Sequence, residues 1–163
     1  MNEIKSGNML GNLSDIEIDN LLKRQVIGRI ACHADGNTYL VPTNYIYDGS
    51  SIISHSALGK KIEMMRKNPE VCFEVEEIQS IFRWQTVIAW GRFEEITDQQ
   101  ERGRAMQGLI HKIMPLVNDP AQHPFHAISV NEYDIETKIE LILFKIVLSS
   151  KTGRFESGEH PKI

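Results

Sequence analysis

Several stretches of this chain have the hydrophobic patterns of β-strands: apolar and polar residues alternate where one face is buried, and residues 139–148 are apolar on both faces, as in a central strand. In residues 71–77, for example, Val71, Phe73 and Val75 alternate with polar or small neighbours. The alternation and the many β-branched and aromatic residues predict six strands, over residues 26–33, 39–47, 51–54, 71–77, 84–96 and 139–148. The chain is therefore expected to be mainly β.

Short turn sequences join several of these strands. Asp35-Gly36 and Asp48-Gly49 are typical of tight hairpins, so the first three strands are expected to be antiparallel neighbours. Consecutive antiparallel strands with few helices favour a small β-barrel over a parallel sheet. The length of 163 residues suits one domain, with loose or polar tails at 1–12 and 152–163.

Three helices are expected around this barrel. Ser14 and Glu17 form a capping box that opens the first helix, which is predicted to run to Lys23. Thr97 and Gln100 are predicted to open a later helix in the same way. Its expected buried face consists of Met106, Leu109, Ile110 and Ile113.

The most informative stretch is the short helix that follows the third strand and stops before Pro69. Leu58, Ile62 and Met65 fall on one predicted face. Lys60 and Lys61 lie in its first turn, where the helix dipole disfavours cations. A bound anion such as phosphate would explain these lysines, with Ser54 and Ser56 as further donors. The alternative is a solvated lysine pair on a surface helix.

Composition narrows the function classes. The net charge of −4 gives no overall attraction to nucleic acid or to anionic membranes, and no apolar run is long enough to span a bilayer. Cys32 and Cys72 lie in strand-like runs and are expected to be buried free thiols of a cytoplasmic protein. No metal site is expected, although His123 and His126 are three residues apart in a proline-rich loop over 115–138.

Two further features of the strands bear on a site. Pro42 cannot donate to a strand ladder, so it is expected at a sheet edge, a bulge or a point where the backbone meets a ligand. Trp84 and Trp90 are six residues apart on one strand and should face the same side. They are expected to pack in the core or a dimer interface, or else to stack on a ligand. Gly91 beside them predicts a bulge.

Four stretches in this order resemble the flavin-binding split-barrel proteins related to pyridoxamine 5′-phosphate oxidase, near the nitroimidazole-resistance branch. They are VIGRIACHADGNTYLVPTNYIYDG, IISHSALGKKIEMMRKNPEVCFEVE, WQTVIAWGRFEEI and LILFKIVLSSKTGR. The resemblance covers about residues 13–151. It implies a six-stranded antiparallel split barrel, usually a homodimer with two molecules of flavin mononucleotide (FMN) across the subunit interface.

The resemblance also implies cofactor-binding residues. The strand expected beside the isoalloxazine ring carries Val41, Pro42, Thr43 and Asn44. The phosphate and ribityl chain match His55, Ser56, Lys60 and Lys61, which favours the anion-binding interpretation. The polar pair expected to reach the cofactor from the partner subunit is Gln85 and Thr86.

The sequence departs from the oxidases proper in two places. Tyr39 and Asn44 stand in the region where those enzymes carry an arginine and a lysine, and their C-terminal substrate-binding segment has no match here. Pyridoxamine phosphate oxidase activity is therefore not expected. The resemblance implies instead a flavin-dependent oxidoreductase that reduces a small aromatic or nitro compound with electrons from NAD(P)H. The catalytic residues stay unassigned, with His55 and Thr86 as the nearest candidates. The alternatives are a non-catalytic flavin carrier or sensor, and a haem-binding or haem-degrading protein.

Overall fold

The computed structural model describes residues 9–116 and 140–158. Three helices and a short 3₁₀ turn (Met114–Leu116) accompany the strands in this part of the chain. The strands are β1 (Met9–Asn12), β2 (Ile27–Ala34), β3 (Asn37–Tyr47), β4 (Ser51–Ala57), β5 (Glu70–Ser80), β6 (Arg83–Glu95) and β7 (Leu141–Ser157). The helices are α1 (Asp15–Arg24), α2 (Lys60–Lys67) and α3 (Gln99–Ile113).

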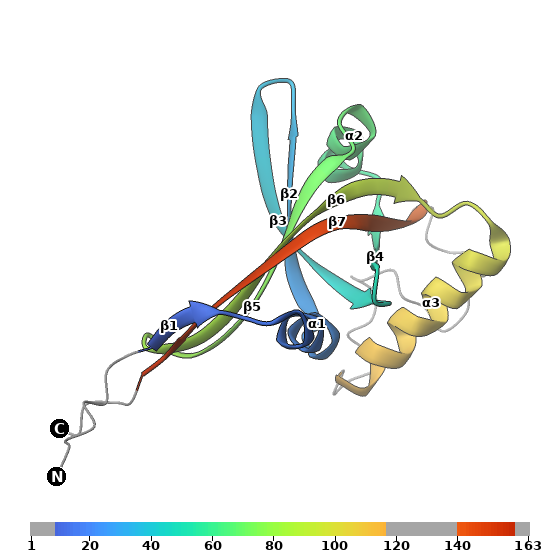
Figure 1. Cartoon of the computed structure of the whole chain (residues 1–163). Helices are drawn as coiled ribbons and strands as arrows, with labels where there is room; N and C mark the ends of the chain where they lie inside the picture. Colours follow the sequence, from blue (N-terminus) through green and yellow to red (C-terminus); the bar gives the residue numbers. More distant parts are fainter. Residues whose placement is uncertain (1–8, 117–139, 159–163) are drawn as a thin grey trace, which may run out of the picture.

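Six of the strands close into an antiparallel ring. The sheet order is β1-β7-β4-β3-β2-β5-β6, and β6 also pairs with β7, which joins the two ends (Figure 1). The expectation of a six-stranded antiparallel barrel is therefore confirmed. β1 is an addition outside the ring, paired with the last four residues of β7.

Alternate residues of the barrel strands point inward and form the core. Ile30, Phe73 and Val87 are fully buried there, and Tyr45 meets Phe73 edge-on with 4.8 Å between ring centres. Gly91 lies where β6 and β7 approach most closely, since a Cβ atom there would lie 2.5 Å from the Val147 carbonyl oxygen. The register of β6 against β7 shifts between Trp90 and Gly91, so the expected irregularity is confirmed.

The ring is weakest between β3 and β4. Only Tyr45, Ile46 and Tyr47 of β3 pair with β4, whereas eight residues of β3 pair with β2. Figure 1 shows the β2–β3 hairpin rising away from the rest of the sheet next to α2. The barrel is thus split along the free half of β3.

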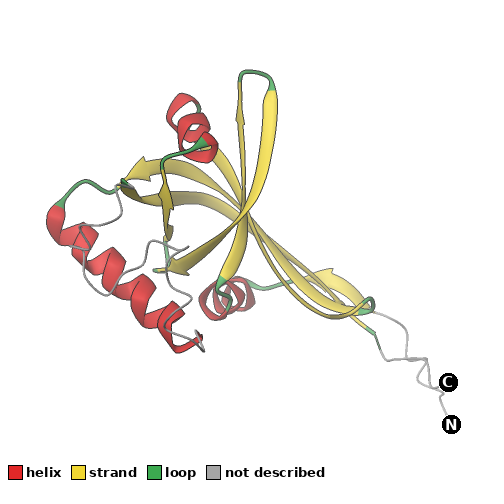
Figure 2. Cartoon of the chain, turned by 180° about the vertical axis from the view of Figure 1, so that it is seen from behind, coloured by secondary structure: helices red, strands yellow, loops and turns green. Residues whose placement is uncertain are grey.

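The helices cover different parts of the barrel (Figure 2). α1 is opened by the expected capping box between Ser14 and Glu17 and buries Ile18, Leu21 and Leu22 in the barrel core. α3 packs with Leu143 and Ile96 in a second apolar cluster outside the barrel. No helix in the described ranges is long and apolar enough to cross a membrane.

Both predicted tails are partly wrong. Residues 9–12 form β1 rather than a loose tail, and β7 runs on to Ser157 instead of ending at 148. The polar pattern of the second half of β7 hid it from the sequence. That half has polar side chains because its outer face is exposed, and its backbone is paired to β6 on one side and β1 on the other.

Some boundaries and faces of the helices also differ from expectation. In α2 the buried residues are Ile62, Met64 and Met65, whereas Leu58 precedes the helix and is exposed. α3 is capped by Asp98, one residue after the expected Thr97. Of its expected buried residues, Ile110 and Ile113 are only half-buried.

The predicted connection over 78–83 is a tight hairpin, because β5 and β6 continue to Ser80 and from Arg83. Trp84 and Trp90 face the same side of β6, as expected, and this is the outer side. Trp84 donates its indole N–H to Glu156 at 2.9 Å, while Trp90 is 43% exposed and so does not pack in the core of this chain.

Candidate functional site

The start of α2 combines free backbone donors with two cations. Gly59 occupies the N-cap position without any side-chain hydrogen bond, so the first N–H groups of the helix have no capping acceptor. Lys60 and Lys61 follow directly, and neither forms an ion pair with a carboxylate in the described part of the chain. A Cβ atom at Gly59 would meet nothing within 4 Å, so there is open space beside these donors.

Lys61 is the more deeply placed of the two lysines. Its side chain is half-buried, with Nζ 5.9 Å from the centre of the Phe144 ring. Burial lowers the pKa of Lys61, because little of the surrounding protein stabilises the charge. A half-buried ammonium group without an anionic partner is costly, and a bound anion would remove that cost.

A second half-buried lysine shows how the fold usually satisfies such a group. Burial lowers the pKa of Lys112 to about 8, and its ammonium group donates to the Gln25 carbonyl at the end of α1. It also lies 4.7 Å from the centre of the Tyr45 ring. Lys112 therefore has a structural role as a helix cap, whereas Lys61 has no comparable acceptor among the described residues.

Tyr39 and Cys32 complete the surroundings of the two lysines. Lys60 Nζ lies 4.8 Å from the centre of the Tyr39 ring on the β2–β3 hairpin. Burial raises the pKa of the Cys32 thiol, and the charges of Lys61 and Lys60 oppose that rise. Sequence reasoning missed both residues as neighbours of the lysines, because their proximity depends on how α2 packs against β2. Cys32 is buried and Cys72 half-buried, and both are free thiols.

The free half of β3 presents backbone groups next to this helix start. Asp35 and Gly36 have positive φ angles of 52° and 76°, as a two-residue hairpin turn requires. Ala34 and Asn37 form the hydrogen-bonded pair that closes this turn. Because such pairs recur at every second residue, the backbone groups of the odd-numbered residues of β3 bond to β2. The hydrogen bond from the Tyr45 N–H to the Val26 carbonyl agrees with this. The backbone groups of Leu40, Pro42 and Asn44 consequently point toward the split.

This alternation explains why a proline is tolerated at position 42 of β3. Pro42 has no N–H to donate and occupies a position that faces the split, so the expectation of a sheet-edge proline is confirmed. At the closed end, Ser54 Oγ donates to the Asn44 carbonyl at 2.7 Å and shares a 2.7 Å hydrogen bond with Thr43 Oγ1. Val41 is half-buried, and its backbone faces β2.

His55 and Ser56 lie on β4, which extends to Ala57, and not in a turn as expected. Successive residues of a strand face opposite sides, so Ser56 shares a face with the buried Ser54, while His55 shares a face with Ile53. Ser56 Oγ donates to the Ala57 carbonyl at 2.8 Å. The two residues flank the split from β4 but do not point to the same place.

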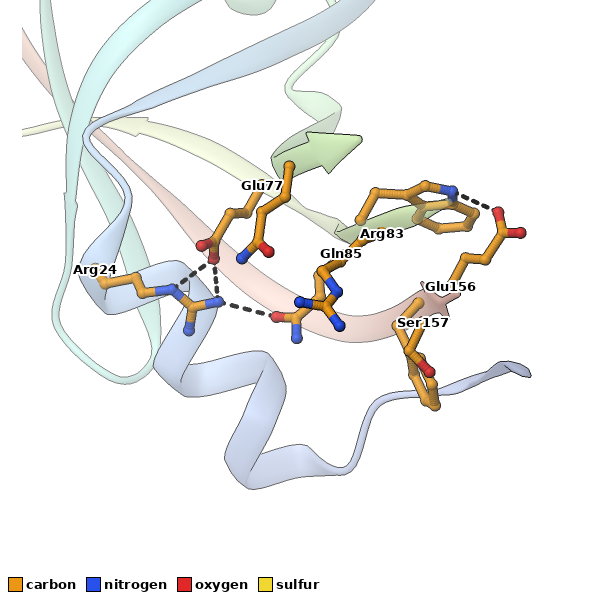
Figure 3. A pocket seen from close by; sticks show the side chains of 9 residues that line it. Arg24, Glu77, Arg83, Gln85, Glu156 and Ser157 are labelled. Atoms are coloured by element: carbon orange, nitrogen blue, oxygen red, sulfur yellow. Dashed lines mark hydrogen bonds and ion pairs between the residues drawn. The ribbon is translucent and has the colours of Figure 1, made fainter. Parts of the chain in front are cut away.

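Gln85 and Thr86 are divided in the same way. Gln85 lies on the inner face of β6 and accepts a 2.9 Å hydrogen bond from Arg24 (Figure 3). Thr86 lies on the outer face, where its hydroxyl donates to Glu74 at 3.1 Å. Arg29 bonds to both Glu74 and Glu76 on that face, at 3.0 and 2.9 Å.

Within one chain, Gln85 and Thr86 lie far from Lys60 and Lys61. Cys32, next to Lys61, pairs with Val71 on β5, whereas Gln85 pairs with Glu77. Val71 and Glu77 are separated by about 20 Å at ~3.3 Å per strand residue. Within a single chain, therefore, the two groups of predicted site residues do not meet.

The histidines considered as metal ligands do not form a second site in the described residues. No group of three or more potential ligands for a metal ion gathers within residues 9–116 and 140–158. His111 is exposed on α3. His123, His126 and the loop over 115–138 fall almost entirely outside the described residues.

Comparison with known proteins agrees with this architecture. A structure of a FAD-binding protein from Mesorhizobium loti is 28% identical, with a TM-score of 0.70, and the match covers 93% of this chain and 99% of that one. A putative 5-nitroimidazole antibiotic resistance protein from Bacteroides thetaiotaomicron is 19% identical, with a TM-score of 0.70 and coverage of 92% and 89%, and shows the same fold.

Sequence comparison gives the family. An uncharacterised protein of Rhizobium meliloti is 35% identical over 74 residues, which are 45% of this chain and 49% of that protein. The chain thus matches only about half the length of this curated relative. The model of the family described as pyridoxamine 5′-phosphate oxidase matches residues 14–137. This match spans most of the chain and includes β2, β3, α2 and β6, so the protein belongs to the pyridoxamine 5′-phosphate oxidase family.

Proposed function

We propose that this protein is a flavoprotein that binds FMN at the start of α2 and along the free edge of β3. The observation that carries the proposal is the lysine pair, which has no carboxylate partner among the described residues and adjoins uncapped helix N–H groups. A phosphate monoester matches these donors in charge and in hydrogen bonding. The named function of the Mesorhizobium loti relative supports a flavin at such a site.

The residues of the chain fit the rest of the cofactor as well. The Leu40 N–H and the carbonyl groups of Leu40 and Pro42 face the split and are available to the polar edge of a flat ring, whereas the Asn44 carbonyl is already bonded to Ser54. Lys60 and Lys61 would hold the phosphate, and Ser56 lies between the two regions on β4. When bound, the flavin supplies the redox chemistry, while the protein binds and orients it.

The same proposal includes a homodimer. The outer faces of β2, β3 and β6 carry apolar residues that a monomer would leave in water: Ile27 is 61% exposed, Leu40 60% and Trp90 43%. Thr86 lies on this outer face and is therefore the better placed member of the polar pair to reach a flavin held by a second copy. Light scattering at micromolar concentration should give about twice the 18.6 kDa of one chain.

The cofactor is tested directly by loading the purified protein and releasing what it holds. Absorbance bands at about 370 and 450 nm identify a flavin, whereas a Soret band would identify haem instead. Chromatography of the released compound separates FMN from FAD, which is the second candidate because the 28% identical relative is named as FAD-binding. A protein that stays colourless and does not quench flavin fluorescence contradicts the proposal.

We also propose that the flavin-loaded protein is a cytoplasmic oxidoreductase that uses NAD(P)H to reduce a small aromatic or nitro compound. Anaerobic stopped-flow mixing with NADH or NADPH should bleach the flavin, and a nitroimidazole or a quinone should then restore its colour. If neither donor reduces a flavin that is shown to be bound, the protein is a carrier or sensor. Residues that transfer protons stay unassigned, with His55 and Thr86 as the ones to substitute first.

A further inference from the structure

A cavity lies at the opposite end of the barrel from the lysine pair. It encloses about 300 Å³ between the C-terminal end of α1 and the inner faces of β5, β6 and β7 (Figure 3). Small-molecule sites begin at about this volume. The lining of the cavity carries two arginines and two glutamates, together with Gln85, Phe155 and Ser157; the charged residues are Arg24, Arg83, Glu77 and Glu156.

Arg24 is held firmly in the wall of this cavity. Arg24 is fixed by Glu77, which accepts from its Nε at 2.8 Å and from its Nη2, and by Gln85 at 2.9 Å. These bonds use one side of the guanidinium and leave its Nη1 donors free to bind a ligand. In Figure 3 the Arg83 guanidinium lies beside Gln85 and opposite Ser157.

Arg83 is the arginine of this cavity that has no partner among the described residues. It makes no hydrogen bond or ion pair with any residue in the described part of the chain. Arg29, Arg66 and Arg92 are each paired with a glutamate, whereas Arg83, like the exposed Arg154 on β7, has no such pair among the described residues. Arg24 is paired with Glu77, and the second carboxylate of the lining, Glu156, accepts the indole N–H of Trp84. Arg83 is therefore the cation of the cavity that has no ion pair among the described residues.

One wall of the cavity is apolar. Phe155 pairs with Gln85 across β6 and β7, and Ser157 pairs with Arg83. The ring of Phe155 also closes over Gly11, where a Cβ atom would lie 2.7 Å from it, so β1 holds the ring in place. A charged donor on β6 thus stands next to a fixed aromatic surface on β7.

We propose that this cavity binds a small carboxylate with an aromatic or apolar body. The carboxylate would accept two parallel hydrogen bonds from Arg83, with Gln85 and Ser157 as further donors. The body of the ligand would pack on Phe155. The site goes beyond the proposed flavin site. Its groups lie far from Lys60 and Lys61 within one chain, and Gln85 points inward to Arg24, away from the outer face on which Thr86 would reach a flavin held by a second copy.

Benzoate is the probe, and benzamide is its uncharged counterpart of the same shape. Titration of the ¹⁵N-labelled full chain should shift the backbone amide signals of Gln85 and Phe155 and leave those of Arg92 and Val147 unchanged. Benzoate should bind at least about 10-fold more tightly than benzamide, because only benzoate pairs with the guanidinium.

Two matched arginine variants test the role of Arg83. R83Q should weaken benzoate binding at least about 10-fold and leave benzamide binding unchanged. R92Q removes an exposed arginine from the same strand, nine residues away, and should change neither affinity by more than about twofold. Equal benzoate affinity in the native protein and R83Q, or shifts confined to other residues, would overturn the proposal.

The flavin is tested as a competitor. Benzoate should bind with the same affinity to flavin-free and flavin-loaded protein. If loading with FMN abolishes benzoate binding and itself shifts Gln85 and Phe155, the cavity belongs to the cofactor and the proposal is wrong. If the protein binds no flavin at all but the R83Q result stands, the flavin proposal fails and this site is supported.

Discussion

The cations at the two ends of α2 differ in whether they have a carboxylate partner. At the C-terminal end, Arg66 bonds to Glu95 at 2.5 Å, Lys67 pairs with Asp35 at 2.5 Å, and the Asn68 amide donates to the His33 carbonyl at 2.9 Å. At the N-terminal end, Lys60 and Lys61 have no carboxylate partner among the described residues. Both ends belong to one helix of eight residues.

The difference separates charges that hold the fold together from charges that are available to a ligand. Cations near a helix C-terminus are favoured by the helix dipole, and here each also has a carboxylate. Cations at the N-terminus are disfavoured, and Lys61 is moreover half-buried. The ring contacts with Tyr39 and Phe144 do not replace an anionic partner, so the lysine end is the one we expect to bind an anion.

The largest effect should come from removing the lysines. K60A/K61A is expected to weaken FMN binding by about 2–4 kcal/mol, since each charged hydrogen bond contributes roughly 1–2 kcal/mol. The melting temperature of the flavin-free protein should not fall. Fluorescence titration and thermal unfolding measure the two quantities, and FMN affinity equal to that of the native protein would refute the phosphate site.

The next effect concerns pH and isolates Lys61. Burial lowers its pKa, so Lys61 in the flavin-free protein loses its proton at a lower pH than an ordinary lysine. FMN affinity should therefore decline as pH rises through that lowered pKa, because only the protonated amine attracts the phosphate. K61R should keep its affinity over the same range, since arginine stays charged. A decline of equal size in K61R would assign the effect to another group.

A smaller effect should follow from replacing the two paired cations at the C-terminal end of α2. R66A/K67A takes away two exposed ion pairs and is expected to lower the melting temperature by no more than about 4 °C. FMN affinity should stay within about twofold of the native value. This double variant is the matched control for K60A/K61A, and the comparison between the two ends fails if it loses the cofactor as well.

The smallest effect should come from Tyr39, whose ring lies beside Lys60. Y39L removes a cation–π contact of roughly 0.5–1 kcal/mol and should weaken FMN binding about two- to fivefold by leaving Lys60 less well oriented. In the K60A background the same substitution should have no effect on affinity. A double-mutant cycle from four titrations gives this coupling, and additive effects would show that the contact does not position Lys60.

Much of this protein could be predicted from the sequence, for local reasons. Strand alternation, the Asp-Gly turn, the Ser14–Glu17 capping box and the stop before Pro69 each depend on a few neighbouring residues, and the structure contains all four. The lysine pair at the start of α2 and the edge position of Pro42 are local features too.

Only the tertiary structure decided which of these residues lie together. The second half of β7 has no apolar run of its own, and it is a strand because β6 pairs with its backbone over residues 150–157 and β1 pairs with its last four residues on the other side. Neighbours in sequence such as Gln85 and Thr86 were expected to act as a pair, yet strand geometry sends them to opposite faces. The contact of Lys60 with Tyr39 and the cavity around Arg83 join residues that are distant along the chain. Such contacts depend on strand register and helix packing, which are set by the whole barrel and not by any single segment.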